Sequence, residues 1–168
     1  MTVPATGKYR NGLEQSLEII MLFLMTSLAV VVIVGVGFRK AGAALVWYDE
    51  VASILLAWLT YYGASLAALK RAHIGFPKLV DSAAPQLRLY LVLCREIIVV
   101  GFFVLVAWAG CQVLLVLNGL YLASLPSVSV RFTQSVIPIG AALFIIAELL
   151  SFAEIWPALQ KATRRQLE

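Results

Sequence analysis

Four long runs without a charged residue constrain this chain more than any other feature of its sequence. They lie at Ile19–Phe38, Val51–Leu69, Ile97–Leu117 and Phe132–Ala147. A helix crosses the hydrocarbon core of a membrane with about 20 mostly apolar residues, and the runs lack the period-two alternation of a membrane β-strand. We therefore predict an all-α integral membrane protein, one membrane domain over residues 1–168, with four transmembrane helices at about 19–38, 51–69, 97–117 and 132–153.

The composition excludes the soluble classes of protein. Apolar residues make up 62% of the chain and charged residues 13%, whereas soluble domains have roughly 45–50% and about 25%. The net charge of +4 comes from basic residues that lie between the apolar runs, where they set membrane topology. We expect no binding of nucleic acid.

The same basic residues predict the orientation of the chain. Ten lysines and arginines lie in the N-terminal tail, the second connection and the C-terminal tail, whereas three lie in the first and third connections. Because cytoplasmic segments carry the excess of positive charge, we predict that both termini are cytoplasmic.

Two segments beside the predicted spans have amphipathic patterns. Over residues 76–92, apolar residues recur at helical spacing opposite a polar face. Near the N-terminus, an apolar stripe is formed by Tyr9, Leu13, Leu17 and Ile20. We predict cytoplasmic interfacial helices at both places, with solvated connectors as the alternative.

Residues that support catalysis or metal binding are scarce. The chain has one histidine, His73, and its two cysteines, Cys94 and Cys111, are about 25 Å apart on one predicted helix. No cluster has metal-ligand spacing, and no phosphate-binding glycine loop or nucleophile elbow occurs. The first three spans contain no charge and no proline, whereas solute sites in membranes normally have intramembrane charges or broken helices. We therefore expect that this chain is not an enzyme, that it binds no cofactor or metal, and that it has no solute site of its own.

Polar residues gather at the ends of the spans. Trp47, Asp49 and Glu50 begin the second span. One interpretation is that they form an interfacial anchor at a helix N-terminus. The alternative is that Asp49 or Glu50 pairs with a basic group, either Arg39 or Lys40 in this chain or a basic residue of a partner.

The fourth span contains the irregular features. An ionised Glu148 costs roughly 2–3 kcal/mol in the membrane unless it is paired, so we predict a structural ion pair in preference to a proton relay. Pro138 predicts a kink, at which the Ser135 hydroxyl satisfies a freed carbonyl. Small residues predict close helix contacts in every span, among them Gly35, Gly37, Gly63, Gly110 and Gly140.

The second span and the segment after it resemble a known family. The residues concerned are, in order, Trp47, Glu50, Trp58, Gly63-Ala64, Lys70-Arg71 and His73-Ile74. Their order and spacing resemble the DctQ-type small membrane subunit of tripartite ATP-independent periplasmic (TRAP) transporters. The matched block runs from about Trp47 to Leu79, and the four-span topology with both ends inside fits over most of the chain.

The resemblance implies a non-catalytic role in transport. Such a small subunit lies in the bacterial inner membrane and binds a much larger elevator-type subunit, which holds the substrate and sodium sites. A periplasmic binding protein captures the substrate, an organic anion such as a dicarboxylate or sialic acid. The small subunit braces the large one and helps to dock the binding protein, and membrane lipids are further partners.

The resemblance also implies where these partners bind. It places Trp47, Asp49 and Glu50 on the periplasmic side, where the binding protein docks. The candidate residues of the partner interface are Arg39, Lys40, Trp47, Asp49, Glu50, Trp58, Gly63, Ala64 and Arg131. The candidate residues of the cytoplasmic boundary, against lipid phosphate or the large subunit, are Arg71, His73 and Glu148.

Two other functions are alternatives. A self-sufficient, homo-oligomeric four-span exchanger of drugs and protons typically has a carboxylate in the middle of its first span, and Met21–Phe38 has none. A membrane enzyme with a site between protomers needs a polar cluster at the cytoplasmic face, for which the candidates are Arg71, His73, Arg95 and Glu96.

Overall fold

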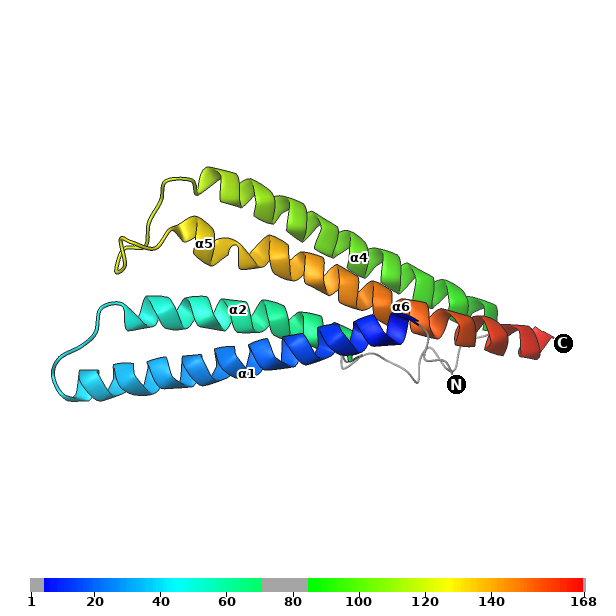
Figure 1. The fold of residues 1–168 in the computed structure, drawn as a ribbon. Coiled ribbons are helices and arrows are strands. Elements are labelled where there is room, and N and C mark those ends of the chain that lie inside the picture. The colour runs from blue at the N-terminus through cyan, green and yellow to red at the C-terminus, as the bar shows by residue number, and fades with distance from the viewer. Residues whose placement is uncertain (1–4, 71–84, 168) are drawn as a thin grey trace.

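The computed structural model describes residues 5–70 and 85–167 and is helical (Figure 1). The helices are α1 (Ala5–Lys40), α2 (Tyr48–Leu69), α4 (Pro85–Val116), α5 (Val130–Gln134) and α6 (Val136–Leu167). These residues form no strand, only a single β-bridge between Tyr121 and Ser129. Four of their helices are long and apolar enough to cross a membrane, which confirms the predicted all-α class with four spanning helices.

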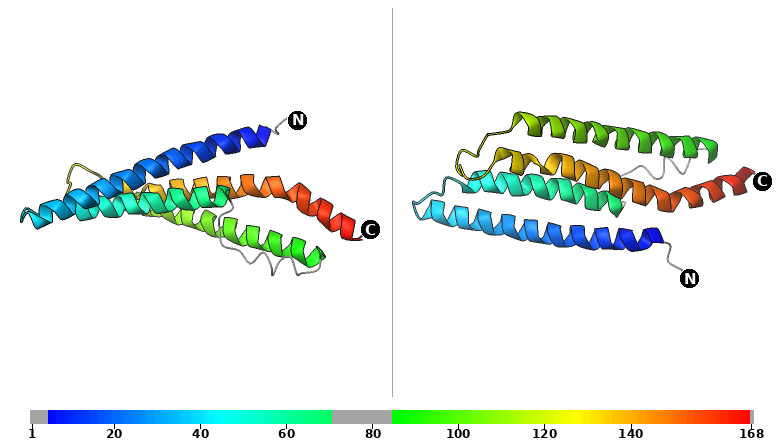
Figure 2. Two further views of the ribbon diagram at one scale, coloured as in Figure 1. Left: turned by 90° about the horizontal axis from the view of Figure 1, so that it is seen from below. Right: turned by 45° about the horizontal axis from the view of Figure 1, so that its top comes forward.

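The long helices lie side by side in the order α1, α2, α6, α4 (Figures 1 and 2). α2 packs against α1 and α6, and α6 also packs against α4. The start of α1 and the end of α6 lie at the same end of the molecule, which we call the termini end (Figure 1). The opposite end, with the connections 41–47 and 117–129, is the hairpin end. α2 and α6 are therefore the inner helices, and α1 and α4 are the outer ones.

The core lies between the helices toward the termini end. Leu17 of α1 is 1% exposed and packs with Leu69 of α2 and with Phe144 and Ala147 of α6. Phe103 of α4 stacks on Phe144 with the ring centroids 3.7 Å apart. Each of the four long helices thus contributes to one apolar cluster.

The segments predicted as interfacial helices are continuous with the spans where they are described. Residues 85–92 form the first turns of α4, and residues 76–84 lie outside the described part of the chain. The N-terminal stripe belongs to α1. Its residue Leu17 is buried in the core and Leu13 packs against it, whereas Ile20 is exposed. An interfacial position for either segment stays a prediction.

Glycines lie where the helices approach most closely. A Cβ at Gly140 of α6 would lie 2.7 Å from the Cβ of Tyr61 in α2, and one at Gly110 of α4 would lie 2.9 Å from Ile137 of α6. A Cβ at Gly63 of α2 would lie 3.1 Å from a methionine methyl of α1. Small residues let membrane helices approach closely, so the predicted role of these three glycines is confirmed. The prediction is wrong for Gly37, because a Cβ there would meet nothing within 4 Å among the described residues.

The fourth span is interrupted as predicted. Ser135 separates α5 from α6, and Pro138 has no N–H to donate to the carbonyl of Gln134. The Ser135 hydroxyl donates to the carbonyl of Phe132 at 2.7 Å and not to that of Gln134, so the role predicted for Ser135 at the carbonyl that Pro138 frees is not found. α6 also bends toward its C-terminal end (Figure 2), and this helix contains Pro157.

Candidate partner interfaces

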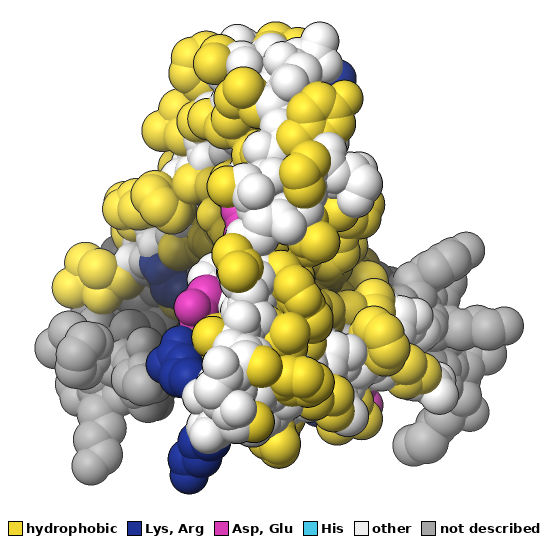
Figure 3. Space-filling model, turned by 90° about the vertical axis from the view of Figure 1, so that its left-hand side faces the viewer, with side chains coloured by type: hydrophobic (Ala, Val, Ile, Leu, Met, Phe, Trp, Pro, Cys, Tyr) yellow, Lys and Arg dark blue, Asp and Glu magenta, His cyan; other side chains and the backbone are white. Residues whose placement is uncertain are grey.

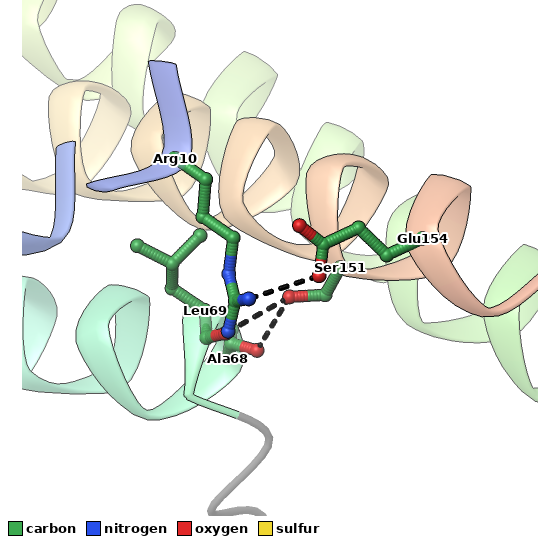
Figure 4. Close-up of polar contacts among 5 residues, drawn as sticks. All are labelled: Arg10, Ala68, Leu69, Ser151 and Glu154. Atoms are coloured by element: carbon green, nitrogen blue, oxygen red, sulfur yellow. Dashed lines mark hydrogen bonds and ion pairs between the residues drawn. The ribbon is translucent and has the colours of Figure 1, made fainter. Parts of the chain in front are cut away.

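At the termini end, polar side chains join α1 and α6 to the last turn of α2 (Figure 4). Arg10 donates from Nη1 to Glu154 Oε2 at 2.9 Å and from Nη2 to the Leu69 carbonyl at 3.1 Å. The buried Ser151 hydroxyl lies 3.1 Å from both the Ala68 and the Leu69 carbonyl and donates to them. The last carbonyls of a helix have no partner within that helix. These contacts therefore satisfy the end of α2 and hold three helices together.

Lys70 continues this cluster at the C-terminus of α2. Its ammonium donates a hydrogen bond to Glu18, and it lies 3.5 Å from Glu14 Oε1. The hydrogen bond to Glu18 raises the pKa of Lys70 above its usual value. The charged ammonium at this helix end also complements the helix dipole, so Lys70 ties α1 to α2.

Glu148 forms an ion pair with the outer helix α4. Arg95 Nη2 lies 2.7 Å from Glu148 Oε1. The Glu148 side chain is 6% exposed, whereas that of Arg95 is 53% exposed. The predicted structural ion pair is confirmed, and its partner is Arg95. The sequence alone did not identify this partner, because Arg95 lies before a different predicted span, and the sequence does not show which spans are neighbours.

At the termini end, the described residues do not include two of the predicted boundary residues and do not form a metal site. Arg71 and His73 lie outside the described part of the chain. Within residues 5–70 and 85–167, no group of three or more His, Cys, Asp or Glu residues is placed to hold a metal ion. Cys94 and Cys111 are free and exposed on α4.

At the hairpin end, Glu50 holds the connection 117–129 over the start of α2. Its carboxylate accepts hydrogen bonds from the backbone N–H of Ser124 at 2.9 Å and of Ala123 at 3.3 Å. The Ser124 hydroxyl donates to the Val46 carbonyl at 3.3 Å. No sequence pattern indicates this role, because Glu50 and Ser124 are more than 70 residues apart.

Arg39 makes the other polar contacts at the hairpin end. Its guanidinium donates to the Tyr48 hydroxyl, lies 5.2 Å from the centre of the Tyr48 ring, and lies 3.8 Å from Asp49 Oδ2. Both members of the Arg39–Asp49 pair are exposed, and exposed pairs contribute little to stability. Lys40 and Arg131 are exposed as well, and no acid in the described residues pairs with either of them.

Three further residues of the predicted interface make contacts inside the chain. The indole N–H of Trp58 donates to the Thr133 carbonyl at 2.9 Å, and its ring lies 5.5 Å from that of Phe132. Because α5 ends one residue after Thr133, the break in the fourth span leaves this carbonyl available. Gly63 lies against α1, and Ala64 packs against the core.

The outer helices expose large apolar side chains. In α6, 39% of the most apolar stretch is buried, against 6% in α4. Large exposed side chains of the outer helices include Ile19, Leu22, Phe23, Met25 and Ile33 of α1 and Ile97, Ile98, Phe102, Leu105 and Trp108 of α4. Seen toward the hairpin end, hydrophobic side chains cover most of the surface, and most charged side chains in view gather at the lower left (Figure 3). These faces suit lipid or another membrane protein.

Comparison with known protein families indicates whether this chain works by itself or as one component of a larger assembly. Residues 28–158 match the family described as tripartite ATP-independent periplasmic transporters, DctQ component. The chain belongs to this family. A comparison with curated proteins gave no match.

The DctQ match covers the C-terminal part of α1 from residue 28, all of α2, α4 and α5, and α6 as far as residue 158. DctQ proteins are the small membrane component of TRAP transporters, which also contain a large membrane subunit and a substrate-binding protein. The match gives no support to the alternative of a self-sufficient exchanger. The resemblance seen in the second span therefore extends over most of the chain.

Proposed function

We propose that this DctQ protein is the non-catalytic small subunit of a sodium-coupled TRAP transporter for an organic anion. It lies in the bacterial inner membrane with both termini cytoplasmic, braces the large elevator-type subunit and helps to dock the substrate-binding protein. The observation that carries the proposal is the family match over residues 28–158.

The internal contacts support a bracing role. Arg95 pairs with Glu148 between α4 and α6, and Arg10 pairs with Glu154 between α1 and α6. Charges near the termini end thus serve to join helices. Glycine contacts bring α1 to α2, α2 to α6 and α4 to α6. A chain joined in this way presents two apolar outer faces on a fixed frame.

The hairpin end supports a docking role for basic side chains. Glu50 is occupied by the backbone of Ser124 and Ala123, so it positions the connection 117–129. Lys40 and Arg131 are exposed and have no acidic partner in the described residues. They are available to an acidic patch on a binding protein, which they would attract over a distance of about a Debye length.

Co-purification tests the proposal directly. The tagged chain is expressed together with the large subunit of its transporter, solubilised in mild detergent and purified by its tag. We expect the large subunit to co-purify at about one copy per copy of this chain, because each small subunit is proposed to brace one large subunit. An unrelated four-span membrane protein with the same tag is the control. A homo-oligomer that lacks the large subunit, although that subunit is expressed and folded, would refute the proposal.

A further inference from the structure

The side of α4 that points away from α6 carries an unusual set of residues. They follow one another at spacings of three or four and so line one side of the helix; we call them the α4 outer face. Its members, all of them exposed, are Cys94, Ile98, Gly101, Leu105, Trp108 and Gln112. Glu96, Phe103 and Gly110 lie on the opposite side of the helix and are buried or packed against α6.

Gln112 is a polar side chain within the membrane span. It lies five residues from the middle of the uncharged run Ile97–Leu117, which places it about 7 Å from the bilayer midplane and well inside the hydrocarbon half-thickness of roughly 15 Å. Its amide is exposed and makes no hydrogen bond within the described residues. Lipid chains offer neither donor nor acceptor, so a side-chain amide at this depth needs a polar group on another protein.

Gly101 gives the same face a close-contact point. A Cβ built at Gly101 would meet nothing within 4 Å, so the chain itself does not require a glycine there. The position lies between the large exposed side chains of Ile98 and Leu105. A small residue flanked by large ones allows a second helix to approach the backbone of α4.

The corresponding face of α1 also has a glycine in open space, Gly37, but it lacks an unpartnered polar side chain. Its exposed residues at helical spacing are Ile19, Leu22, Thr26, Val30, Ile33 and Gly37. The polar member, Thr26, donates its hydroxyl to the Leu22 carbonyl of the same helix at 2.8 Å. Every side chain on the outer face of α1 is therefore compatible with lipid.

We propose that the α4 outer face is the surface on which a membrane-spanning helix of the large subunit packs, and that the outer face of α1 contacts lipid. The partner helix places a hydrogen-bonding group opposite Gln112 and approaches most closely at Gly101. This inference rests on the proposed function, because it names which face of the small subunit the large subunit uses.

A matched pair of glycine substitutions tests the assignment. Gly101→Leu and Gly37→Leu each place a large apolar side chain in open space on an outer helix, and leucine favours helix more than glycine does. Both variants should therefore fold alone with the yield and elution profile of the parent chain. With the large subunit co-expressed, we expect Gly101→Leu to reduce its recovery about tenfold through overpacking at the contact, and Gly37→Leu to leave recovery unchanged.

Gln112→Leu provides a second, independent variant. It removes the hydrogen-bonding group and keeps an apolar side chain of similar length. We expect recovery of the large subunit to fall severalfold, by roughly the loss of one interhelical hydrogen bond. Thr26→Val on α1 is the control and should leave recovery at the parent level.

The possible outcomes distinguish the large subunit from lipid and from a second copy of this chain. They also distinguish a failure of this inference from a failure of the proposed function. Parent-level recovery with both Gly101→Leu and Gln112→Leu would show that α4 faces lipid and would overturn the inference while the proposed function stands. Loss with Gly37→Leu instead would assign the interface to α1 and overturn it too. Disulfide-linked pairs of this chain through Cys94 in the intact complex would indicate a second copy and would also overturn it. Failure of the parent chain itself to recover the large subunit is a failure of the proposed function.

Discussion

The inner helices and the outer helices differ in how far this chain completes its own contacts. Between α2 and α6, Gly140 lies against Tyr61, and the buried Ser65 hydroxyl lies 3.3 Å from the Gly140 carbonyl. On α4, by contrast, Gly101 faces open space and Gln112 has no hydrogen-bond partner within the described residues. Both regions contain small and polar residues, but only the inner one provides a partner for them. The difference indicates that the inner pair serves the fold and that the α4 outer face serves an assembly.

The largest effect is expected at the inner contact. Gly140→Leu places a side chain where even a Cβ lies 2.7 Å from Tyr61, and we expect it to lower the free energy of unfolding by about 3 kcal/mol. Thermal unfolding in detergent measures this change, with Gly37→Leu as the control. Equal melting temperatures for the two variants would mean that inner and outer glycines are equivalent.

The ion pair between α4 and α6 should give the next largest effect. Arg95→Leu leaves the 6% exposed carboxylate of Glu148 without its partner, and we expect a loss of about 2 kcal/mol, less than for a fully buried pair because Arg95 is half-exposed. Replacing both residues, as Arg95→Leu with Glu148→Leu, should recover most of the loss. A double-mutant cycle measures the coupling, and additive losses would show that the pair does not contribute.

A smaller effect is expected at the end of α2. Ser151→Ala removes the buried hydroxyl that donates to Ala68 and Leu69, at a cost of about 1 kcal/mol. Arg10 still donates to Leu69 in this variant, so the helix end keeps one partner. Denaturation in the same detergent tests this, with Ser53→Ala as the control, since the Ser53 hydroxyl bonds only within α2. Ser53→Ala should be close to neutral, and a loss as large as that of Ser151→Ala would contradict the assignment.

The smallest effect on stability is expected at the hairpin end. Lys40→Glu with Arg131→Glu changes two exposed side chains and should shift the free energy of unfolding by less than about 0.5 kcal/mol. Uptake by the assembled transporter should nevertheless fall, because docking of the binding protein depends on complementary charge. Uptake assays at low and high salt measure this, and uptake at the parent level at both salt concentrations would remove the docking role.

The features that could be predicted from the sequence are those that depend on local pattern. The uncharged runs predicted four spanning helices, Pro138 predicted the break before α6, and the isolated Glu148 predicted an ion pair. The identity of the pairing residue depends on which helices are neighbours, and local pattern does not contain this information. For the same reason Trp58 and Glu50 were assigned to a partner interface, whereas the structure also gives them contacts with Thr133 and Ser124 inside the chain.

The outer faces of α1 and α4 also could not be distinguished from the sequence alone. The sequence contains Gln112 and Gly101 in a run of large apolar residues, but their significance depends on which side of α4 packs against α6. Once Gly110 and Phe103 are seen to face α6, the opposite side of the helix is defined. Gln112 on that side then distinguishes α4 from α1, although both helices contain a long apolar span.

Reconstituted transport tests the central claim most directly. Proteoliposomes with an inward sodium gradient receive this chain alone, the large subunit alone, or both, and the binding protein is added outside with its radiolabelled organic anion. Because this chain is proposed to brace a subunit that holds the substrate site, we predict no uptake with this chain alone and the highest uptake with both. Uptake of the anion by this chain alone, or unchanged uptake when it is left out, would contradict the account.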